Sequence, residues 1–216
     1  MKKVLVAFAV SSALTSNVFA EELVVENSKF YVGASIGQTS TDISKDELGF
    51  SDEVKLDDTD TAIKLIGGYN INKNFSIEAS YNDLGEVKAS YENSFSDGIV
   101  SWSYQESLTA EASGITLSIL GKLPLSESFN LFAKAGMNFW DVEGTYKYSE
   151  RIAIPIDGID ERYSDSGSDD DDGKDAFFAV GGEYNFSKIA VRLEYEMFTL
   201  DDTDVDVISI GATYNF

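Results

Sequence analysis

The sequence contains no cysteine and no histidine among its 216 residues, and it has only two prolines. Without cysteine, the chain cannot build the disulfide framework that many exported proteins use. Without histidine, it lacks the commonest general base and metal ligand, and with them the Ser-His and Cys-His nucleophile pairs. The remaining Ser, Asp and Glu residues form no recognisable catalytic, metal or cofactor constellation, so we expect a protein that is not an enzyme.

Positive charge is also scarce, because 16 lysines and arginines face 38 aspartates and glutamates, for a net charge of −22. A chain this acidic repels nucleic acids and other polyanions. Any direct surface partner is therefore expected to be basic or to be bridged by cations. Aromatic residues make up 12% of the chain, which argues against a disordered acidic tail.

Beyond the first twenty residues, no apolar run approaches the roughly 18 residues that a membrane-spanning helix needs. The first twenty combine Lys2 and Lys3, an apolar run over residues 4–14, and a Val18-Phe19-Ala20 ending. This pattern is typical of a secretory signal peptide. We predict a cleaved signal peptide over residues 1–20 and one domain over residues 21–216.

The prominent feature of that domain is alternation of apolar and polar side chains, as in ISIGATYNF at residues 208–216. Alternation with a period of two indicates a strand with one apolar face. Most of the segments have nine to twelve residues, close to the 9–11 that a bilayer-spanning strand needs and about twice the usual strand length. Eight such segments are present: 30–38, 61–70, 75–84, 114–123, 129–140, 176–186, 189–198 and 205–216.

The connections between these segments alternate in length. Short turns lie at residues 71–74, 124–128 and 187–188, whereas the intervening connections are long or strongly acidic: 39–60, 85–113, 141–175 and 199–204. Short turns at one end and long loops at the other are typical of up-and-down outer-membrane barrels. We predict an all-β fold, an eight-stranded antiparallel up-and-down transmembrane β-barrel with short periplasmic turns and long extracellular loops.

The two faces of the predicted strands differ in charge. One alternate set carries no charge, and the other contains Lys64, Glu78, Lys122, Lys134, Glu183, Arg192, Glu194 and Glu196. A soluble barrel would bury the uncharged set as its core. Strand length, the export signal and aromatic residues at the short-turn end favour lipid contact instead. These aromatic residues are Tyr69, Phe75, Phe129, Tyr184, Phe186, Tyr214 and Phe216.

Residues 67–85, 114–137 and 180–196 resemble the transmembrane domain of outer membrane protein A and its small eight-stranded relatives. The terminal Tyr214-Asn215-Phe216 is similar to the aromatic-ended signal that such barrels offer to the barrel-assembly machinery. The resemblance implies a porin-family protein in the outer membrane of a Gram-negative bacterium, in contact with lipid and lipopolysaccharide. We further expect a monomer.

The resemblance also implies an ion-pair gate inside the barrel. Position by position, Glu78, Lys134, Glu183, Arg192 and Glu194 match the lumen charges of that family. Leu120 stands where the family gate has a lysine. Lys122, two residues further on and on the same face, is expected to supply that charge, and Lys64 completes the predicted set.

Physical reasoning leaves two interpretations of these interior charges open. Eight strands leave an interior just wide enough for side chains, and buried charges must be paired. Four basic and four acidic side chains therefore suit a closed polar plug. The alternative is a gated ion path that opens when Arg192 or Lys134 exchanges carboxylate partners.

Two of the long connections have a distinctive composition. Residues 165–175 (DSGSDDDDGKD) are expected to be a solvated charge run, since they lack the ligand order of a calcium-binding EF-hand. Because clustered carboxylates can ligate Ca²⁺, calcium binding is the weaker alternative. Residues 85–113 carry Tyr91, Phe95, Trp102 and Tyr104 among serines, a composition that suits protein contact surfaces. The favoured alternative is that the flanking strands continue beyond the membrane and stack these rings.

The sequence thus favours a structural and surface-interaction role, in envelope integrity and in adhesion through acidic extracellular loops, with a plugged lumen. The alternative is a low-conductance gated channel, porin-like, for ions or small solutes. A membrane-embedded acyl-transferring or acyl-cleaving enzyme is the third class, and the missing histidine and cysteine disfavour it.

Overall fold

The computed structural model describes residues 29–42, 54–201 and 203–216, and the predicted signal peptide lies outside them. The described residues contain no helix long and apolar enough to cross a membrane. A single 3₁₀ turn, Pro155–Asp157, interrupts a chain of strands. These are β1 (Phe30–Thr41), β2 (Lys55–Asp57), β3 (Thr59–Asn70), β4 (Phe75–Ser96), β5 (Ser101–Pro124), β6 (Phe129–Ile154), β7 (Ile159–Phe186), β8 (Ile189–Leu200) and β9 (Thr203–Asn215).

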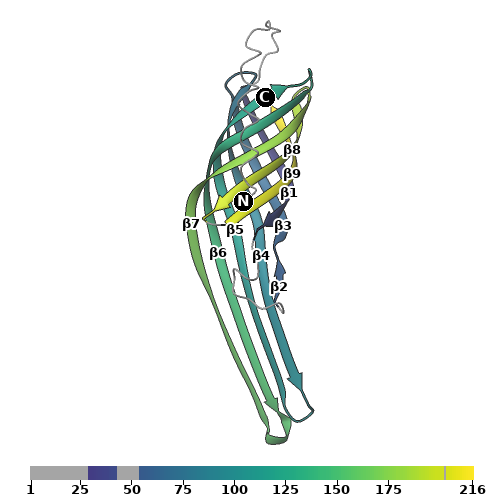
Figure 1. Ribbon diagram of the computed structural model, residues 1–216, viewed down its shortest axis with the longest axis vertical. Coiled ribbons are helices and arrows are strands. Elements are labelled where there is room, and N and C mark those ends of the chain that lie inside the picture. The colour runs from purple at the N-terminus through teal and green to yellow at the C-terminus, as the bar shows by residue number, and fades with distance from the viewer. Residues whose placement is uncertain (1–28, 43–53, 202) are drawn as a thin grey trace, which may run out of the picture.

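All of these strands except β2 form a closed antiparallel ring. Neighbours in the chain pair in sequence from β3 to β9, and β1 closes the ring between β3 and β9. The short β2 lies beside β4, where Leu56 pairs with Ala89. The predicted eight-stranded antiparallel up-and-down barrel is therefore confirmed. Figure 1 shows the short turns at one end of the barrel and the long hairpins at the other.

The outward face of the barrel carries the predicted uncharged side chains. Burial alternates residue by residue along β8, where Arg192 is 3% exposed and the adjacent Leu193 is 61% exposed. Large apolar side chains on the other strands, such as Ile119 and Ile208, are exposed to a similar extent. So wide an apolar surface is stable against lipid rather than water, which explains why the charged set lies inside.

Aromatic rings gather at the short-turn end, as expected for a membrane-interface girdle. Phe30 and Tyr69 meet at 5.0 Å between ring centroids. Tyr184 and Phe186 lie 4.6 Å apart, and Tyr214 and Phe216 lie 5.4 Å apart. These pairs lie on β1 and β3, on β7, and at the end of β9, all near the short turns.

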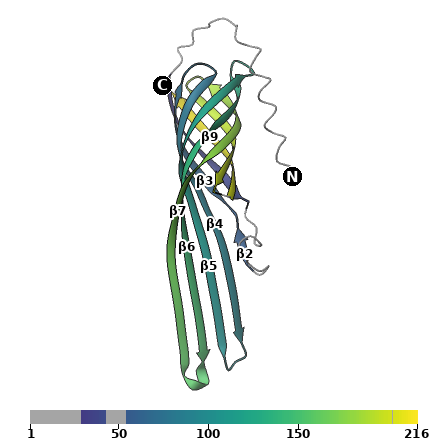
Figure 2. The same cartoon turned by 60° about the vertical axis from the view of Figure 1, so that its left-hand side comes forward.

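Strands β4 to β7 have 22 to 28 residues, whereas β1, β3, β8 and β9 have 12 or 13. The excess length projects beyond the barrel as a four-stranded sheet, here called the extension (residues 86–112 and 141–176). Figures 1 and 2 show it as two long hairpins that lie side by side. The prediction of loops over 85–113 and 141–175 was therefore wrong for most of their length.

The physical reason is that both segments keep a strand pattern and find partners. Leu108, Tyr146 and their neighbours alternate with polar residues, and strand pairing continues from barrel to tip, with one register shift between β4 and β5. Even the acidic run pairs regularly, with Asp171 opposite Val142 and Asp169 opposite Gly144. Backbone hydrogen bonds to β6 hold this run extended although its side chains repel one another.

A β-bulge in β4 marks the junction between barrel and extension. Asp83 pairs with Ser113 and Glu86 pairs with Glu111, so two residues of β4 face one residue of β5. Gly85 supplies the left-handed conformation, with φ of 78°. The bulge moves the inward positions of β4 from even to odd numbers, so the odd-numbered apolar set that faces outward in the barrel faces inward in the extension.

Replacing Gly85 by alanine is expected to lower the free energy of unfolding by about 2 kcal/mol. The added methyl group would combine an unfavourable positive φ with contact at 2.7 Å from Asp60 Oδ2. Gly98→Ala is the matched control, because its φ is 88° and no atom lies near its added methyl group. We expect a loss of about 1 kcal/mol there. Urea unfolding in lipid vesicles measures both, and equal losses would contradict a role for the contact.

Candidate functional site

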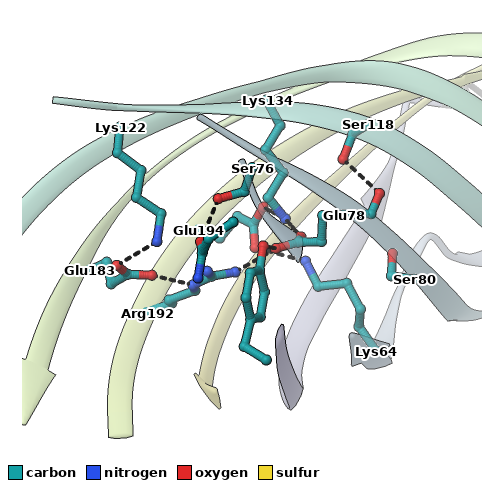
Figure 3. A network of polar contacts seen from close by, with 12 residues as sticks. Lys64, Ser76, Glu78, Ser80, Ser118, Lys122, Lys134, Glu183, Arg192 and Glu194 are labelled. Atoms are coloured by element: carbon teal, nitrogen blue, oxygen red, sulfur yellow. Dashed lines mark hydrogen bonds and ion pairs between the residues drawn. The ribbon is translucent and has the colours of Figure 1, made fainter. Parts of the chain in front are cut away.

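Eight charged side chains meet inside the barrel and are here called the lumen network. All eight belong to the charged set that the alternation pattern predicts, and seven of them, all except Glu196, are the predicted gate residues. Figure 3 shows the seven predicted gate residues projecting toward one another from different strands. Apart from Lys122, each is at most 4% exposed. The members are Lys64 on β3, Glu78 on β4, Lys122 on β5, Lys134 on β6, Glu183 on β7, and Arg192, Glu194 and Glu196 on β8.

One half of the network centres on Arg192. Its Nε donates to Glu183 Oε2 and its Nη1 to Glu78 Oε2, both at 2.7 Å. Lys122 Nζ donates to the other oxygen of Glu183 at 3.0 Å. The planar guanidinium fork thus donates two charge-assisted hydrogen bonds, from two different nitrogens, to carboxylates on two different strands.

The other half centres on two lysines. Lys134 pairs with both Glu78 and Glu194. Lys64 Nζ lies 2.8 Å from Glu194 Oε2 and 2.5 Å from Glu196 Oε2. The eight groups therefore form one chain of strictly alternating sign from Lys122 to Glu196. Alternation leaves every buried charge beside an opposite one, which is the condition for tolerating charges out of water.

Tyr31 completes the network, and the sequence analysis did not single it out. Its hydroxyl donates to Glu78 Oε2 at 2.8 Å, and its ring centroid lies 5.1 Å from Arg192 Cζ. Gly68, opposite in register, makes room for this ring, because a Cβ there would lie 1.9 Å from Tyr31 Cζ. The sequence signal for this contact was a glycine at the position that pairs with an aromatic residue on the neighbouring strand.

Leu120 lies in the lumen with no exposed surface and takes no part in the charge chain. Lys122, the residue expected to supply the charge missing at this position, pairs with Glu183 at 3.0 Å. On the mouth side of the network, the lumen becomes apolar. Its cluster consists of Ala62, Leu84, Trp140, Phe177, Phe198, Leu200, Val205 and Val207.

A cavity of about 660 Å³ opens above this apolar cluster and is here called the cup. Its floor includes Leu84, Trp140 and Val205, and its walls come from the base of the extension and from β2. Trp140 Nε1 donates to Asp175 Oδ2 at 2.8 Å, which fixes the indole across the floor. The cup is closed below by the packed lumen.

The inner face of the extension, which continues the lumen side of the barrel, carries a ladder of aromatic rings. Tyr91, Tyr104, Tyr148 and Tyr163 follow one another across all four strands at 5.3 to 5.7 Å between centroids. The favoured alternative from the sequence, strands that continue and stack their rings, is confirmed for Tyr91, Trp102 and Tyr104. Such cross-strand pairs stabilise the sheet.

Two carboxylates hold this ladder by hydrogen bonds. Glu150 accepts from Trp102 Nε1 at 2.7 Å and from the Tyr148 hydroxyl at 2.9 Å, which lowers the pKa of its carboxyl group. Glu106 accepts from the Tyr104 hydroxyl at 2.7 Å, and this bond raises the pKa of Tyr104 to about 12. The inner face therefore combines rings with ionised carboxylates.

The acidic run on β7 is divided between two faces. Asp169 and Asp171 line the cup, whereas the register of the strand turns Asp170 and Asp172 to the outer face. Within the described part of the chain, no group of three or more acidic side chains is placed to hold a metal ion. The aspartates at 165 and 169–172 are exposed, as expected of a solvated run, but the run is part of strand β7 rather than a loop.

Removing the Glu78 carboxylate is expected to destabilise the barrel by about 3–5 kcal/mol, because Arg192 and Lys134 would each lose a buried partner. Glu78→Gln tests this with almost no change in volume. Glu86→Gln, which breaks the exposed pair with Lys88, is the control and should cost at most about 1 kcal/mol. Urea midpoints of refolded protein give both values, and similar losses would mean that the network contributes no special stability.

The pKa of Glu150 predicts an acid transition in the extension. A carboxyl group whose pKa is lowered on folding adds stability above its unfolded value, and this stability is lost as the pH falls through the folded value. In a Trp140→Phe chain, Trp102 fluorescence should therefore change below about pH 4. The added substitution Glu150→Gln should abolish that transition. A transition that persists unchanged would assign it to another group.

The family of the chain follows from comparison with known proteins. A family model described as "Outer membrane protein beta-barrel domain" matches residues 6–216. No curated protein sequence gave a significant match.

Several solved structures are similar. The attachment invasion locus protein Ail of Yersinia pestis, in complex with the heparin analogue sucrose octasulfate, is 15% identical, with 87% of this chain and 99% of that chain covered and a TM-score of 0.42. The N-terminal β-barrel domain of Pseudomonas aeruginosa OprF is 10% identical over 88% and 99% of the two chains, with a TM-score of 0.45. Neisserial surface protein A is 13% identical over 87% and 97%, with a TM-score of 0.44.

The family match spans nearly the whole sequence and agrees with a closed ring of strands whose outward face is apolar. The chain therefore belongs to the outer membrane protein β-barrel family, whose members lie in the outer membrane of Gram-negative bacteria.

Proposed function

We propose that the protein is a closed, non-enzymatic outer-membrane barrel that carries a contact surface outside the cell. The observation that carries this proposal is the contrast between its two halves. The lumen is filled by an alternating chain of charges, while four strands continue as a sheet with an aromatic inner face. The barrel acts as the anchor, and the extension acts in adhesion and in envelope integrity.

The packing of the lumen supports a closed barrel. Glu78, Glu183 and Arg192 are each at most 3% exposed, and Phe177 and Phe198 stack at 5.3 Å directly on the mouth side. A solute would have to separate paired charges and displace the stacked rings. Eight strands leave no room for a water column beside these side chains.

The composition of the extension supports a basic partner. Tyrosine rings attract cationic groups, and the neighbouring Glu106 and Glu150 add complementary charge. The opposite face of the extension consists mainly of Ser, Thr and charged residues, such as Ser103 and Ser149, and offers no such rings. The inner face is therefore the surface on which a basic or cation-bridged partner is expected.

The remaining expected partners belong to the membrane itself. The exposed apolar band suits outer-membrane lipid and lipopolysaccharide, and we propose a monomer within it. Tyr214, on β9, and Phe216, just after it, form an exposed ring pair. We propose that this pair is the signal read by the barrel-assembly machinery.

A low-conductance gated channel is the second candidate function. The observation that favours it is double pairing, since Arg192 and Lys134 each contact two carboxylates. A cation with two partners can release one and keep the other. In this proposal the predicted gate residues Lys64, Glu78, Lys122, Lys134, Glu183, Arg192 and Glu194 open a narrow path by such an exchange.

Conductance in a planar bilayer separates the two candidates. We expect the refolded mature protein to insert, as shown by heat-dependent gel mobility, and to give no current steps. Discrete steps that change when Arg192 is replaced by lysine would instead establish the gated channel.

The contact surface is tested by attachment of intact cells to polyarginine-coated glass. Replacing Tyr91, Trp102, Tyr104 and Tyr148 together by serine should reduce attachment several-fold, because ring contacts to guanidinium groups are lost. The matched control replaces the outer-face Ser90, Ser103 and Ser149 by alanine and should attach normally. Equal attachment of all three chains, at equal surface amounts, would reject the inner face as the contact surface.

A further inference from the structure

The floor of the cup is apolar and built from well-packed side chains. Leu84, Trp140, Leu200 and Val205 are between 3% and 7% exposed, and all four line the cavity. Ala110, Ala112 and Val142 continue the apolar surface up the base of the extension. A cavity of this size and lining falls in the range of small-molecule sites. Burial of an apolar body there is favourable because it removes apolar surface from water.

The walls of the cup are acidic. The described residues that line it include six carboxylates and neither lysine nor arginine. The carboxylates are Asp58, Asp60, Glu86, Asp169, Asp171 and Asp201. Nearby lysines are placed elsewhere by strand alternation, since Lys147 and Lys174 stand on the outer face of the extension.

The six carboxylates are not equally engaged by the protein. Asp60 accepts hydrogen bonds from the backbone amides of Thr61 at 2.7 Å and Glu86 at 2.8 Å. Glu86 pairs with Lys88. Asp169 and Asp171 stand two positions apart on one face of β7 and both line the cavity, and Asp171 Oδ1 accepts from the backbone amide of Asp172 at 3.0 Å. As an adjacent pair on one strand they offer two negative charges at one place, which suits a positive charge in the cup.

We propose that the cup is a binding site for a cationic amphiphile, a small molecule with an apolar body and an ammonium or guanidinium head group. The apolar body would rest on Trp140 and Leu84, and the head group would lie at Asp169 and Asp171. An anionic amphiphile of the same shape is repelled by the wall, and a neutral one gains only the apolar contact.

The site captures its ligand from outside the cell. Below the floor, Phe177, Phe198 and the lumen network fill the barrel, so the cup has no continuation into the membrane-spanning part. The inference does not depend on the contact surface proposed above, because it concerns a small molecule in the cavity and not a macromolecule on the aromatic ladder.

Tryptophan fluorescence provides a direct test. The chain has two tryptophans, so Trp102→Phe leaves Trp140, on the cup floor, as the single reporter. The protein is placed in nanodiscs of zwitterionic lipid and titrated with 4-cyclohexylbutylammonium, with empty nanodiscs correcting for partition into lipid. The matched probes are 4-cyclohexylbutanol and 4-cyclohexylbutanoate. We expect a saturable change with the cation, at a Kd at least about tenfold below that of the alcohol, and no saturation with the carboxylate.

The contribution of the wall charge to this preference for the cation is tested with two matched double variants on β7. Asp169→Asn with Asp171→Asn should bring the Kd of the cation within about twofold of the alcohol. Asp170→Asn with Asp172→Asn removes the same charge from the outer face and should leave the tenfold preference intact. Ala112→Phe fills the cup and should weaken both the cation and the alcohol. Heat-dependent gel mobility verifies that each variant is folded.

Three results would overturn the proposal. The first is an absence of saturable response to the cation in the folded Trp102→Phe protein. The second is equal affinity for the cation and the carboxylate. The third is equal weakening by the two Asp-to-Asn pairs, which would assign the attraction to the general acidity of the surface rather than to the cup.

Discussion

The whole structure depends on filling a lumen that is only as wide as the side chains of eight strands. Charged groups occupy it, and their desolvation is tolerated because they alternate in sign along one continuous chain of contacts. This chain ties together six of the eight strands, and Tyr31 brings in a seventh. The same contacts that make the interior acceptable therefore also fix how the strands are arranged around it.

The extension follows from a second constraint, the period of two in a strand. In the barrel the apolar set of each strand faces lipid, whereas in the extension the aromatic residues of all four strands lie on the lumen side, where their rings meet. The bulge at Gly85 achieves this in β4, where the inward positions change from even to odd. The result is one surface that passes without a break from a charged interior, through the apolar cup, to the aromatic ladder.

Most of the barrel could be predicted from the sequence, because alternation over nine to twelve residues is a strong signal. It placed Glu78, Lys134 and Arg192 on a common inward face. The extension was harder to predict, since runs such as DSGSDDDDGKD have little β-propensity and become strand only through pairing with β6. Tyr31 and the cup were not predicted at all, because each depends on which positions face one another across strands.

The bulge has a further consequence for how such a protein can change length during evolution. Any insertion or deletion of one residue in β4 between Gly85 and the hairpin tip would move the following side chains of that strand to the opposite face. Residues 97–100 and 155–158 form the turns at the two hairpin tips. A change in the number of these turn residues leaves the faces of the flanking strands unchanged. Variation in reach should therefore accumulate at the tips, or arise by paired changes of two residues in adjoining strands, while the junction with the barrel keeps its phase.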